Sequence, residues 1–292
     1  MKYTIASGRF SATVNDMGAE LVSLTDGSAE YIWIGDEAYW GGQNPHLFPV
    51  IGRVKMGHID FDGVAYPMQS HGFARRHPYT VVEHSADRIV MRLTENETTL
   101  ASYPFTFALT IAHTVFDGGF TTSFTVKNTD TKPMPYNVGA HTGIHLPAIG
   151  AQSVEGCRLE FEKEETATVW YGDEHILIRD DFVRTDILQH TNRVDLPNEL
   201  FDGDALICGN LNSQSLRLIS PDGRAVRMDF AGFPVMAIWT PPKKAAPFVC
   251  LEPWHGMQAK TFASCSFDDR PYTVTLAPGE ETTHAYTVCV EK

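Results

Sequence analysis

The sequence has few of the features that mark secreted, membrane or nucleic-acid-binding proteins. Its 292 residues include only five cysteines, which are far apart and form no Cys-x-x-Cys pair, so a disulfide framework is not expected. The first twenty residues lack the apolar core of a signal peptide, and no run of 18 apolar residues occurs anywhere. We therefore expect a cytoplasmic protein with reduced thiols and no membrane contact.

Positive charge is also scarce. The formal net charge is −13, and no basic stripe with interleaved aromatic residues is present, so nucleic acid is not an expected partner. A few local arginines can still bind an anion within an acidic protein. At 43% apolar and 20% charged residues, the composition is that of a globular protein that buries a substantial core.

What the sequence has in abundance is the pattern of short β-strands. Stretches rich in Val, Ile, Thr, Phe and Tyr alternate with turn signals such as Asp117-Gly118-Gly119 and Pro221-Asp222-Gly223. Helical patterning is confined to a turn or two near residues 98–103 and 197–201. No linker or fixed-period repeat interrupts the pattern. We predict an all-β fold of two large antiparallel sheets packed face to face, in a single domain over residues 1–292.

Polar and ionisable residues concentrate in four stretches that also contain prolines or glycines: NPHLFPVIGRV, MQSHGFARRH, MPYNVGAHTGIHLP and VCLEPWHG. In the last of these, Phe248–Leu251 has the pattern of a buried strand, and Glu252 is expected at its end. A carboxylate in such a place is costly unless it is paired or used. Glu252 is therefore a candidate functional residue on the sequence pattern alone.

These stretches resemble the aldose 1-epimerase (galactose mutarotase) family, and within it the LacX-like branch. The resemblance spans nearly the whole chain. It implies a galactose-mutarotase-like supersandwich, an isomerase that needs no cofactor or metal, and a monosaccharide as the partner, bound by a monomer or homodimer. Its marks are the segments 44–49, 52–53, 71–75, 139–141, 204–207 and 251–254.

The resemblance also implies roles for individual residues. Glu252 corresponds to the general base that takes the proton from the sugar C1 hydroxyl, and His141 to the general acid that protonates the ring oxygen. His71 corresponds to a second active-site histidine, Arg53 to a sugar-binding arginine, and Asp204 to a carboxylate that binds ring hydroxyls. An acid and a base at these two oxygens suffice to open a pyranose ring and invert the anomer on reclosure.

Two further residues bear on the identity of the substrate. Arg75 lies in an HGFAR segment that also occurs in hexose-6-phosphate mutarotases, where arginines bind the phosphate, and a guanidinium suits that anion. Trp254 follows Glu252 and is expected either to contact the apolar face of a sugar or to belong to the core. The substrate is thus a hexose that is either free or phosphorylated.

One feature departs from the family pattern. Better-known members have an aromatic residue two positions after the acid histidine, whereas this chain has Gly143 after His141 and Thr142. The departure concerns how the sugar is held. His141 and His145 also share a spacing of four with helical zinc ligands, but Gly143 argues against a helix.

Besides catalysis, a carbohydrate-binding protein without activity remains an alternative, because function depends on the site rather than the fold. A glycoside hydrolase would need a second catalytic carboxylate.

Overall fold

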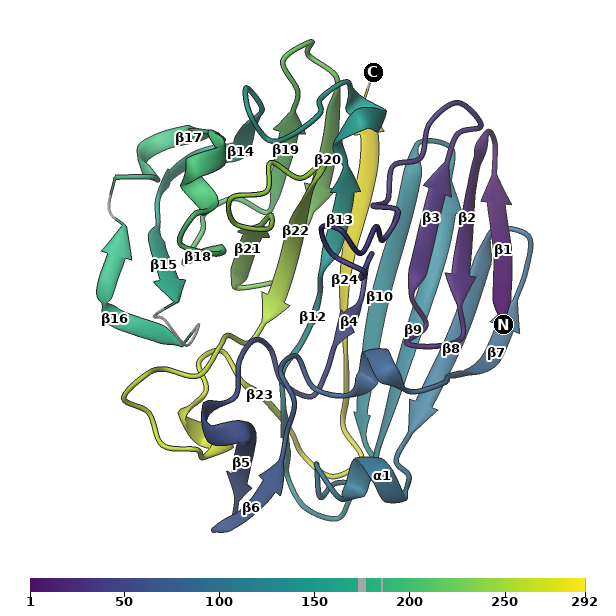
Figure 1. Ribbon diagram of the computed structural model, residues 1–292. Helices are drawn as coiled ribbons and strands as arrows, with labels where there is room; N and C mark the ends of the chain where they lie inside the picture. Colours follow the sequence, from purple (N-terminus) through teal and green to yellow (C-terminus); the bar gives the residue numbers. More distant parts are fainter. Residues whose placement is uncertain (173–176, 185, 292) are drawn as a thin grey trace.

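The computed structural model describes residues 1–172, 177–184 and 186–291. Two large antiparallel sheets dominate it (Figure 1). The nine-stranded sheet has the order β17 (Gln189–Asp195), β14 (Arg158–Thr166), β19 (Ser215–Ile219), β20 (Ala225–Asp229), β24 (Glu281–Glu291), β10 (Gly119–Asn128), β9 (Phe107–Phe116), β8 (Arg88–Thr94) and β7 (Thr80–His84).

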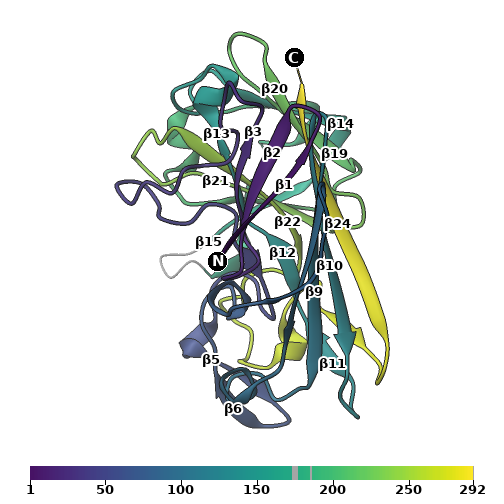
Figure 2. The same cartoon turned by 90° about the vertical axis from the view of Figure 1, so that its right-hand side faces the viewer.

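The eight-stranded sheet carries the residues of interest. Its order is β16 (Ile178–Arg184), β15 (Thr168–Gly172), β18 (Leu206–Gly209), β21 (Val235–Trp239), β22 (Phe248–His255), β12 (Val138–Ala140) and β4 (His46–Leu47), with β13 (Thr142–His145) also paired to β22. In the side view, its strands β21, β22 and β12 lie to the left of the long strands β10 and β24 of the nine-stranded sheet (Figure 2).

Smaller elements surround the two sheets. A three-stranded sheet contains β1 (Lys2–Ser7), β2 (Phe10–Asn15) and β3 (Leu21–Thr25). β5 (His58–Phe61) and β6 (Val64–Pro67) form a hairpin, and β11 (Met134–Tyr136) pairs with the distant β23 (Val274–Leu276). The helical elements are short: α1 (Glu97–Leu100), and the 3-10 turns η1 (Lys55–Gly57), η2 (Ala74–Arg76), η3 (Leu146–Ile149), η4 (Asn198–Phe201) and η5 (Phe267–Asp269). Among the described residues, no helix is long and apolar enough to span a membrane.

Side-chain alternation on the eight-stranded sheet separates a core face from a site face. On β22, Val249 and Leu251 belong to the main core together with residues of the nine-stranded sheet, such as Ile111 and Phe124. Successive side chains of a strand point to opposite faces. The even-numbered positions of β22 therefore point away from the nine-stranded sheet, and Glu252 is among them.

The predicted all-β supersandwich is confirmed, and the two short helical turns occur at α1 and η4. The expected position of Glu252 at the end of a strand is wrong. β22 continues through Pro253 to His255, because its pairing with β21 runs on to Val235 opposite Trp254. Glu252 thus projects from the middle of a central strand, where the backbone on both sides is held by neighbouring strands.

Candidate active site

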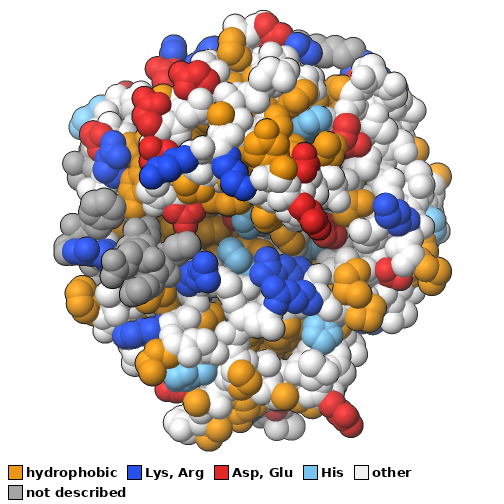
Figure 3. Space-filling model, in the orientation of Figure 1, with side chains coloured by type: hydrophobic (Ala, Val, Ile, Leu, Met, Phe, Trp, Pro, Cys, Tyr) orange, Lys and Arg blue, Asp and Glu red, His pale blue; other side chains and the backbone are white. Residues whose placement is uncertain are grey.

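A cavity of about 320 Å³ lies on the site face of the eight-stranded sheet. In the space-filling view, the hollow near the middle of this face shows hydrophobic and histidine side chains, and blue Lys and Arg side chains lie around its rim (Figure 3). All seven residues predicted from the sequence line it: Arg53, His71, Arg75, His141, Asp204, Glu252 and Trp254. The structure therefore brings together residues from five of the six segments that carry the family resemblance.

His141 and Glu252 face each other because of strand register. β12 pairs with β22 with Gly139 opposite Trp254, and β13 pairs with it with Thr142 opposite Leu251. The same register places His141 opposite Glu252, so both side chains project on one face. Their Nε2 and Oε1 atoms are 3.3 Å apart. The exposed fractions are 9% for His141 and 1% for Glu252, so the pair is nearly free of bulk solvent.

The backbone around this pair has two notable features. Pro253, which has no N–H, lies opposite Ala140 in the pairing between β22 and β12/β13, and on the far side from β22 the His141 backbone N–H donates to Pro45 O (3.1 Å). On the other side of Glu252, β21 places Ala237 directly opposite. The short alanine side chain leaves space beside the carboxyl group that a larger residue would fill.

Burial shifts both members of the pair toward their neutral forms. Desolvation lowers the pKa of His141 to about 3, and the positive charge of Arg75 acts in the same direction. Desolvation raises the pKa of Glu252 well above its usual value; the negative charge of Asp204 adds to this and the Trp254 side chain opposes it. His141 Nδ1 and Glu252 Oε2 are both buried without a hydrogen-bond partner. These shifts favour neutral imidazole and carboxylic acid, so the pair as a whole carries one titratable proton and no net charge. His141 Nδ1 and Glu252 Oε2 remain available for hydrogen bonds.

His71 enters the cavity from a tight turn. Its backbone has φ 61° and is followed by Gly72 at φ 69°, where an added Cβ would lie 2.1 Å from Phe48 O. Its Nδ1 accepts the Gly52 N–H at 3.2 Å. Burial and the charge of His141 lower the pKa of His71 well below its usual value. His71 is therefore neutral with its proton on Nε2, which makes it a hydrogen-bond donor.

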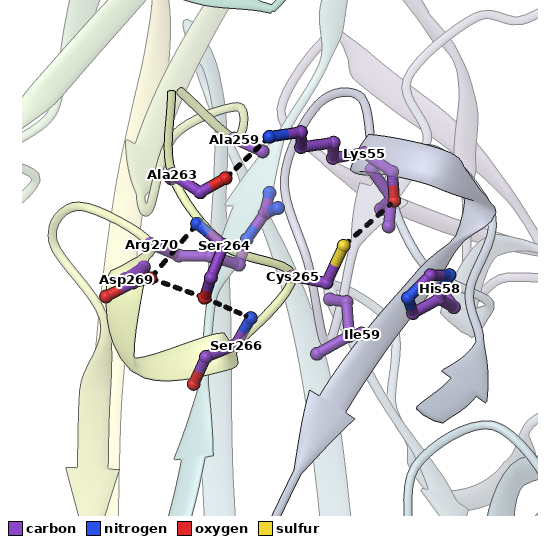
Figure 4. Close-up of a pocket in the computed structure, with 11 residues that line it drawn as sticks. Lys55, His58, Ile59, Ala259, Ala263, Ser264, Cys265, Ser266, Asp269 and Arg270 are labelled. Atoms are coloured by element: carbon purple, nitrogen blue, oxygen red, sulfur yellow. Dashed lines mark hydrogen bonds between the residues drawn. The ribbon is translucent and has the colours of Figure 1, made fainter. Parts of the chain in front are cut away.

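Arg270 braces the turn that carries Gly52 and Arg53. This buried guanidinium donates to Ile51 O, to Met257 O (2.9 Å) and to Asn137 Oδ1 (3.2 Å). In the close-up, it lies beside Asp269 and Ser264, across from Lys55 and Ile59 (Figure 4). The cavity at this place has a volume of about 10 Å³, which is too small for a sugar. This region supports the site from outside.

Asp204 and Trp239 form the opposite wall. Desolvation raises the pKa of Asp204, whereas a hydrogen bond from the Trp239 side chain, the Ala205 backbone N–H and the charge of Arg53 lower it. Asp202, the neighbouring carboxylate in the sequence, is exposed and does not line the cavity. The structure therefore distinguishes the two aspartates.

Arg75 lies at the edge of the cavity and forms no ion pair with a carboxylate of the described residues. Its Nη2 donates to Ser70 O at 3.0 Å, and its Nε is buried without a hydrogen-bond partner. Neither Arg75 nor Arg53 forms an ion pair with any described residue, whereas Arg184, Arg193, Arg217, Arg224 and Arg227 all do. Two arginines without an ion pair thus line the same cavity as Asp204 and Glu252.

Comparison with known proteins shows the family to which this chain belongs. The aldose 1-epimerase family model matches residues 1–289. The chain belongs to the aldose 1-epimerase family. It is 29% identical to the plasmid-encoded protein LacX of Lactococcus lactis subsp. lactis over 282 residues, 94% of each chain. Among solved structures, a galactose mutarotase related enzyme from Lactobacillus acidophilus has a TM-score of 0.93 at 26% identity, covering 100% of this chain and 98% of its own. A galactose mutarotase-like protein from Lactobacillus casei has 0.89 at 28% identity, covering 100% of both.

Membership of this family does not account for every residue around the acid–base pair. His141, Cys250 and Glu252 offer ligand atoms that all lie within 4.8 Å of one another, a donor set that zinc accepts. Burial raises the pKa of the Cys250 thiol well above its usual value, and the charge of Glu252 adds to this, so metal binding would have to displace its proton. His145 lies elsewhere, with Nδ1 2.9 Å from Glu30 O.

Several lining residues were not predicted from the sequence: Trp40, Gly52, Ser70, Ala205, Trp239 and Gln258. Trp239 ends β21 on the face that lines the cavity. Trp40 carries no sequence signal, because it lies in an irregular segment between β3 and β4. The alternation Val235, Ala237, Trp239 on one face of β21 could have indicated Trp239; nothing comparable exists for Trp40.

Proposed function

We propose that this protein is an aldose 1-epimerase that interconverts the α and β anomers of a hexose, with Glu252 as base and His141 as acid. The observation that carries the proposal is the 3.3 Å approach of His141 Nε2 to Glu252 Oε1 at the base of the cavity. The two sugar oxygens that exchange protons, O1 and O5, are bonded to the same carbon. An acid and a base in mutual contact match that requirement.

The reaction conserves the proton count of the pair. Glu252 takes the O1 proton as His141 delivers a proton to O5, the C1–O5 bond breaks, and an open-chain aldehyde forms. Rotation about C1–C2 and the reverse transfers close the ring as the other anomer. Ring opening thus moves the pair from carboxylate and imidazolium to carboxylic acid and neutral imidazole, the form that burial favours in the empty cavity. The pKa directions therefore favour the protonation state that accompanies the aldehyde.

The remaining cavity residues fit sugar binding. His71 offers an Nε2–H donor, Asp204 a carboxylate for ring hydroxyls, and Arg53 a cation at the rim. Trp239 and the indole of Trp40 are half-buried and present apolar surface of the kind that packs on the C–H face of a pyranose. No step requires a metal or an organic cofactor.

A phosphorylated hexose is the second candidate substrate, and Arg75 favours it. The Arg75 Nε–H has no hydrogen-bond partner and can donate to a phosphate oxygen, an acceptor that a guanidinium matches well. Free hexoses would leave this capacity unused.

Polarimetry tests the proposal directly. Fresh α-glucose and α-galactose are followed to anomeric equilibrium with and without the protein, and the 6-phosphates are followed by NMR exchange. Acceleration that Glu252→Gln removes would support the epimerase. Binding of these sugars without any acceleration would instead indicate a carbohydrate-binding protein, and release of reducing sugar from an oligosaccharide would indicate a hydrolase.

A further inference from the structure

No hydrogen bond at Nδ1 fixes the orientation of the His141 ring. The second ring nitrogen of a catalytic histidine commonly bonds to a carbonyl or carboxylate that fixes the ring. Here Nδ1 is buried without any hydrogen-bond partner, and Nε2 faces Glu252. A different kind of contact must hold the imidazole in place.

Aromatic rings surround the imidazole instead. Trp40 stacks on its face with ring centroids 4.7 Å apart and an interplanar angle of 28°. Trp239 and His71 approach at 5.6 Å, each at 75°, as edge contacts. Of the three, only Trp40 lies flat against the face of the imidazole. It therefore restrains rotation of the His141 ring out of its own plane.

Trp40 is itself firmly placed, although its segment is irregular. The Trp33 indole N–H donates to Trp40 O at 2.8 Å, and the Trp40 ring stacks on Phe248 at 5.7 Å. The segment is tied to the strand that follows His141, because Trp33 N donates to Gly143 O and Gly143 N donates to Gln43 O, both at 2.9 Å. A Cβ at Gly143 would lie 2.9 Å from Gln43 O, so glycine permits this contact.

We infer that Trp40 is a positioning residue for His141, whose indole face holds the imidazole against Glu252 in the orientation needed for proton transfer to the sugar ring oxygen. The role of Trp40 in catalysis rests on the proposed function, whereas its role in holding the His141 ring does not. An indole face also tolerates a cation above it, so the stack is compatible with both protonation states of His141.

Three variants test this inference by mutarotation kinetics. Trp40→Leu is expected to lower kcat about 10- to 100-fold, since general acid catalysis contributes about 10²–10⁴-fold and depends on alignment. Trp40→Phe keeps a flat ring and is expected to recover most of kcat. Tyr39→Leu is the control, because Tyr39 lies in the same segment but outside the cavity lining, and it should leave kcat unchanged. A rise in KM alone for Trp40→Leu, or an equal loss in Tyr39→Leu, would overturn the inference.

A crystal structure of Trp40→Leu separates this inference from the proposed function. We expect the His141 ring to rotate and its contact with Glu252 to be lost in Trp40→Leu, and both to be retained in Trp40→Phe. An unchanged His141 in Trp40→Leu would overturn the positioning role whatever the activity. A displaced His141 in a protein whose wild type does not accelerate mutarotation would refute the epimerase and leave the positioning role intact.

Discussion

His141, the residue between β12 and β13, lies directly opposite Glu252 of β22, with their Nε2 and Oε1 atoms 3.3 Å apart. The contact follows from the register that pairs Gly139 with Trp254 and Thr142 with Leu251. Because both strands lie inside the sheet, the backbone of each residue is fixed from both sides. The pair is preorganised before any ligand arrives.

Replacing Glu252 by Gln is expected to reduce kcat by about 10²–10⁴-fold, the contribution of a general base. The amide keeps the shape of the side chain but cannot accept the O1 proton, so sugar affinity should stay within a few-fold of the wild type. Polarimetry gives the rate and isothermal titration calorimetry the affinity. Asp202→Asn is the matched control, since Asp202 is exposed. Full activity of Glu252→Gln would disprove the assignment of the base.

The kcat/KM of the enzyme is expected to show a broad plateau with pH. The pKa of His141 lies at about 3 and that of Glu252 is raised, so the pair keeps one proton over the interval between them. The rate should fall in acid as a second proton binds, and in alkali as the shared proton is lost. Measurement needs subtraction of the spontaneous reaction at each pH. A narrow optimum centred near pH 6.5 would contradict the shifts.

Low pH should also lower the free energy of unfolding. The pH profile of kcat/KM can therefore be measured only down to the pH at which the protein stays folded. Burial lowers the pKa of His46 to about 3 and that of His113 to about 4. The unfolded chain protonates these residues near pH 6.5, so it binds more protons than the native state, and stability is lost as the pH falls below that value. Urea midpoints at pH 7, 5 and 4 check this. A constant midpoint would show that other groups compensate.

Arg75 should matter more for a phosphorylated sugar than for a free one. Arg75→Met is expected to lower kcat/KM for a hexose 6-phosphate by about 10-fold or more, the equivalent of one charge-assisted hydrogen bond, and to leave the free hexose nearly unchanged. Arg76→Met is the control, because Arg76 is exposed and does not line the cavity. Equal losses on both sugars would rule out a phosphate-binding role for Arg75.

Replacing Gly72 by alanine should lower the free energy of unfolding more than the same change at Gly63, a glycine of similar backbone conformation. In Gly72→Ala, the added Cβ would lie 2.1 Å from Phe48 O, whereas Gly63, at φ 78°, has nothing within 4 Å. Gly63→Ala should cost about 1 kcal/mol of unfolding free energy from its left-handed backbone, and Gly72→Ala about 3 kcal/mol or more. Urea unfolding measures both. Equal costs would mean that the turn carrying His71 shifts easily.

Removal of metal should have no effect on the rate. In the proposed mechanism the acid–base pair accounts for every proton transfer, so dialysis against a chelator is expected to leave kcat unchanged. Loss of activity that Zn²⁺ restores would instead make His141, Cys250 and Glu252 metal ligands. Cys250→Ala then distinguishes a ligand thiol from a packing residue.

Local patterns in the sequence predicted the all-β fold and singled out Glu252, whereas the resemblance to the aldose 1-epimerase family implied most of the other candidate site residues. Alternating Val, Ile, Thr and Phe residues with turn signals predict antiparallel strands, because each strand buries one face. The HGFAR and LEPW segments drew attention to His71, Arg75 and Glu252, all of which line the cavity. Strand patterns and short motifs depend only on the order of neighbouring residues, so they can be recognised in the sequence without the structure.

Tertiary structure alone decided the contacts between segments that are distant in the chain. The register between β22 and β12/β13 places His141 against Glu252 in the middle of a sheet, and the packing of residues 33–43 on Gly143 places Trp40 over His141. Better-known family members have an aromatic residue where this chain has Gly143, and here Trp40 provides a ring beside His141 from another part of the chain. Such contacts depend on how strands pair and pack in three dimensions, which no local pattern specifies.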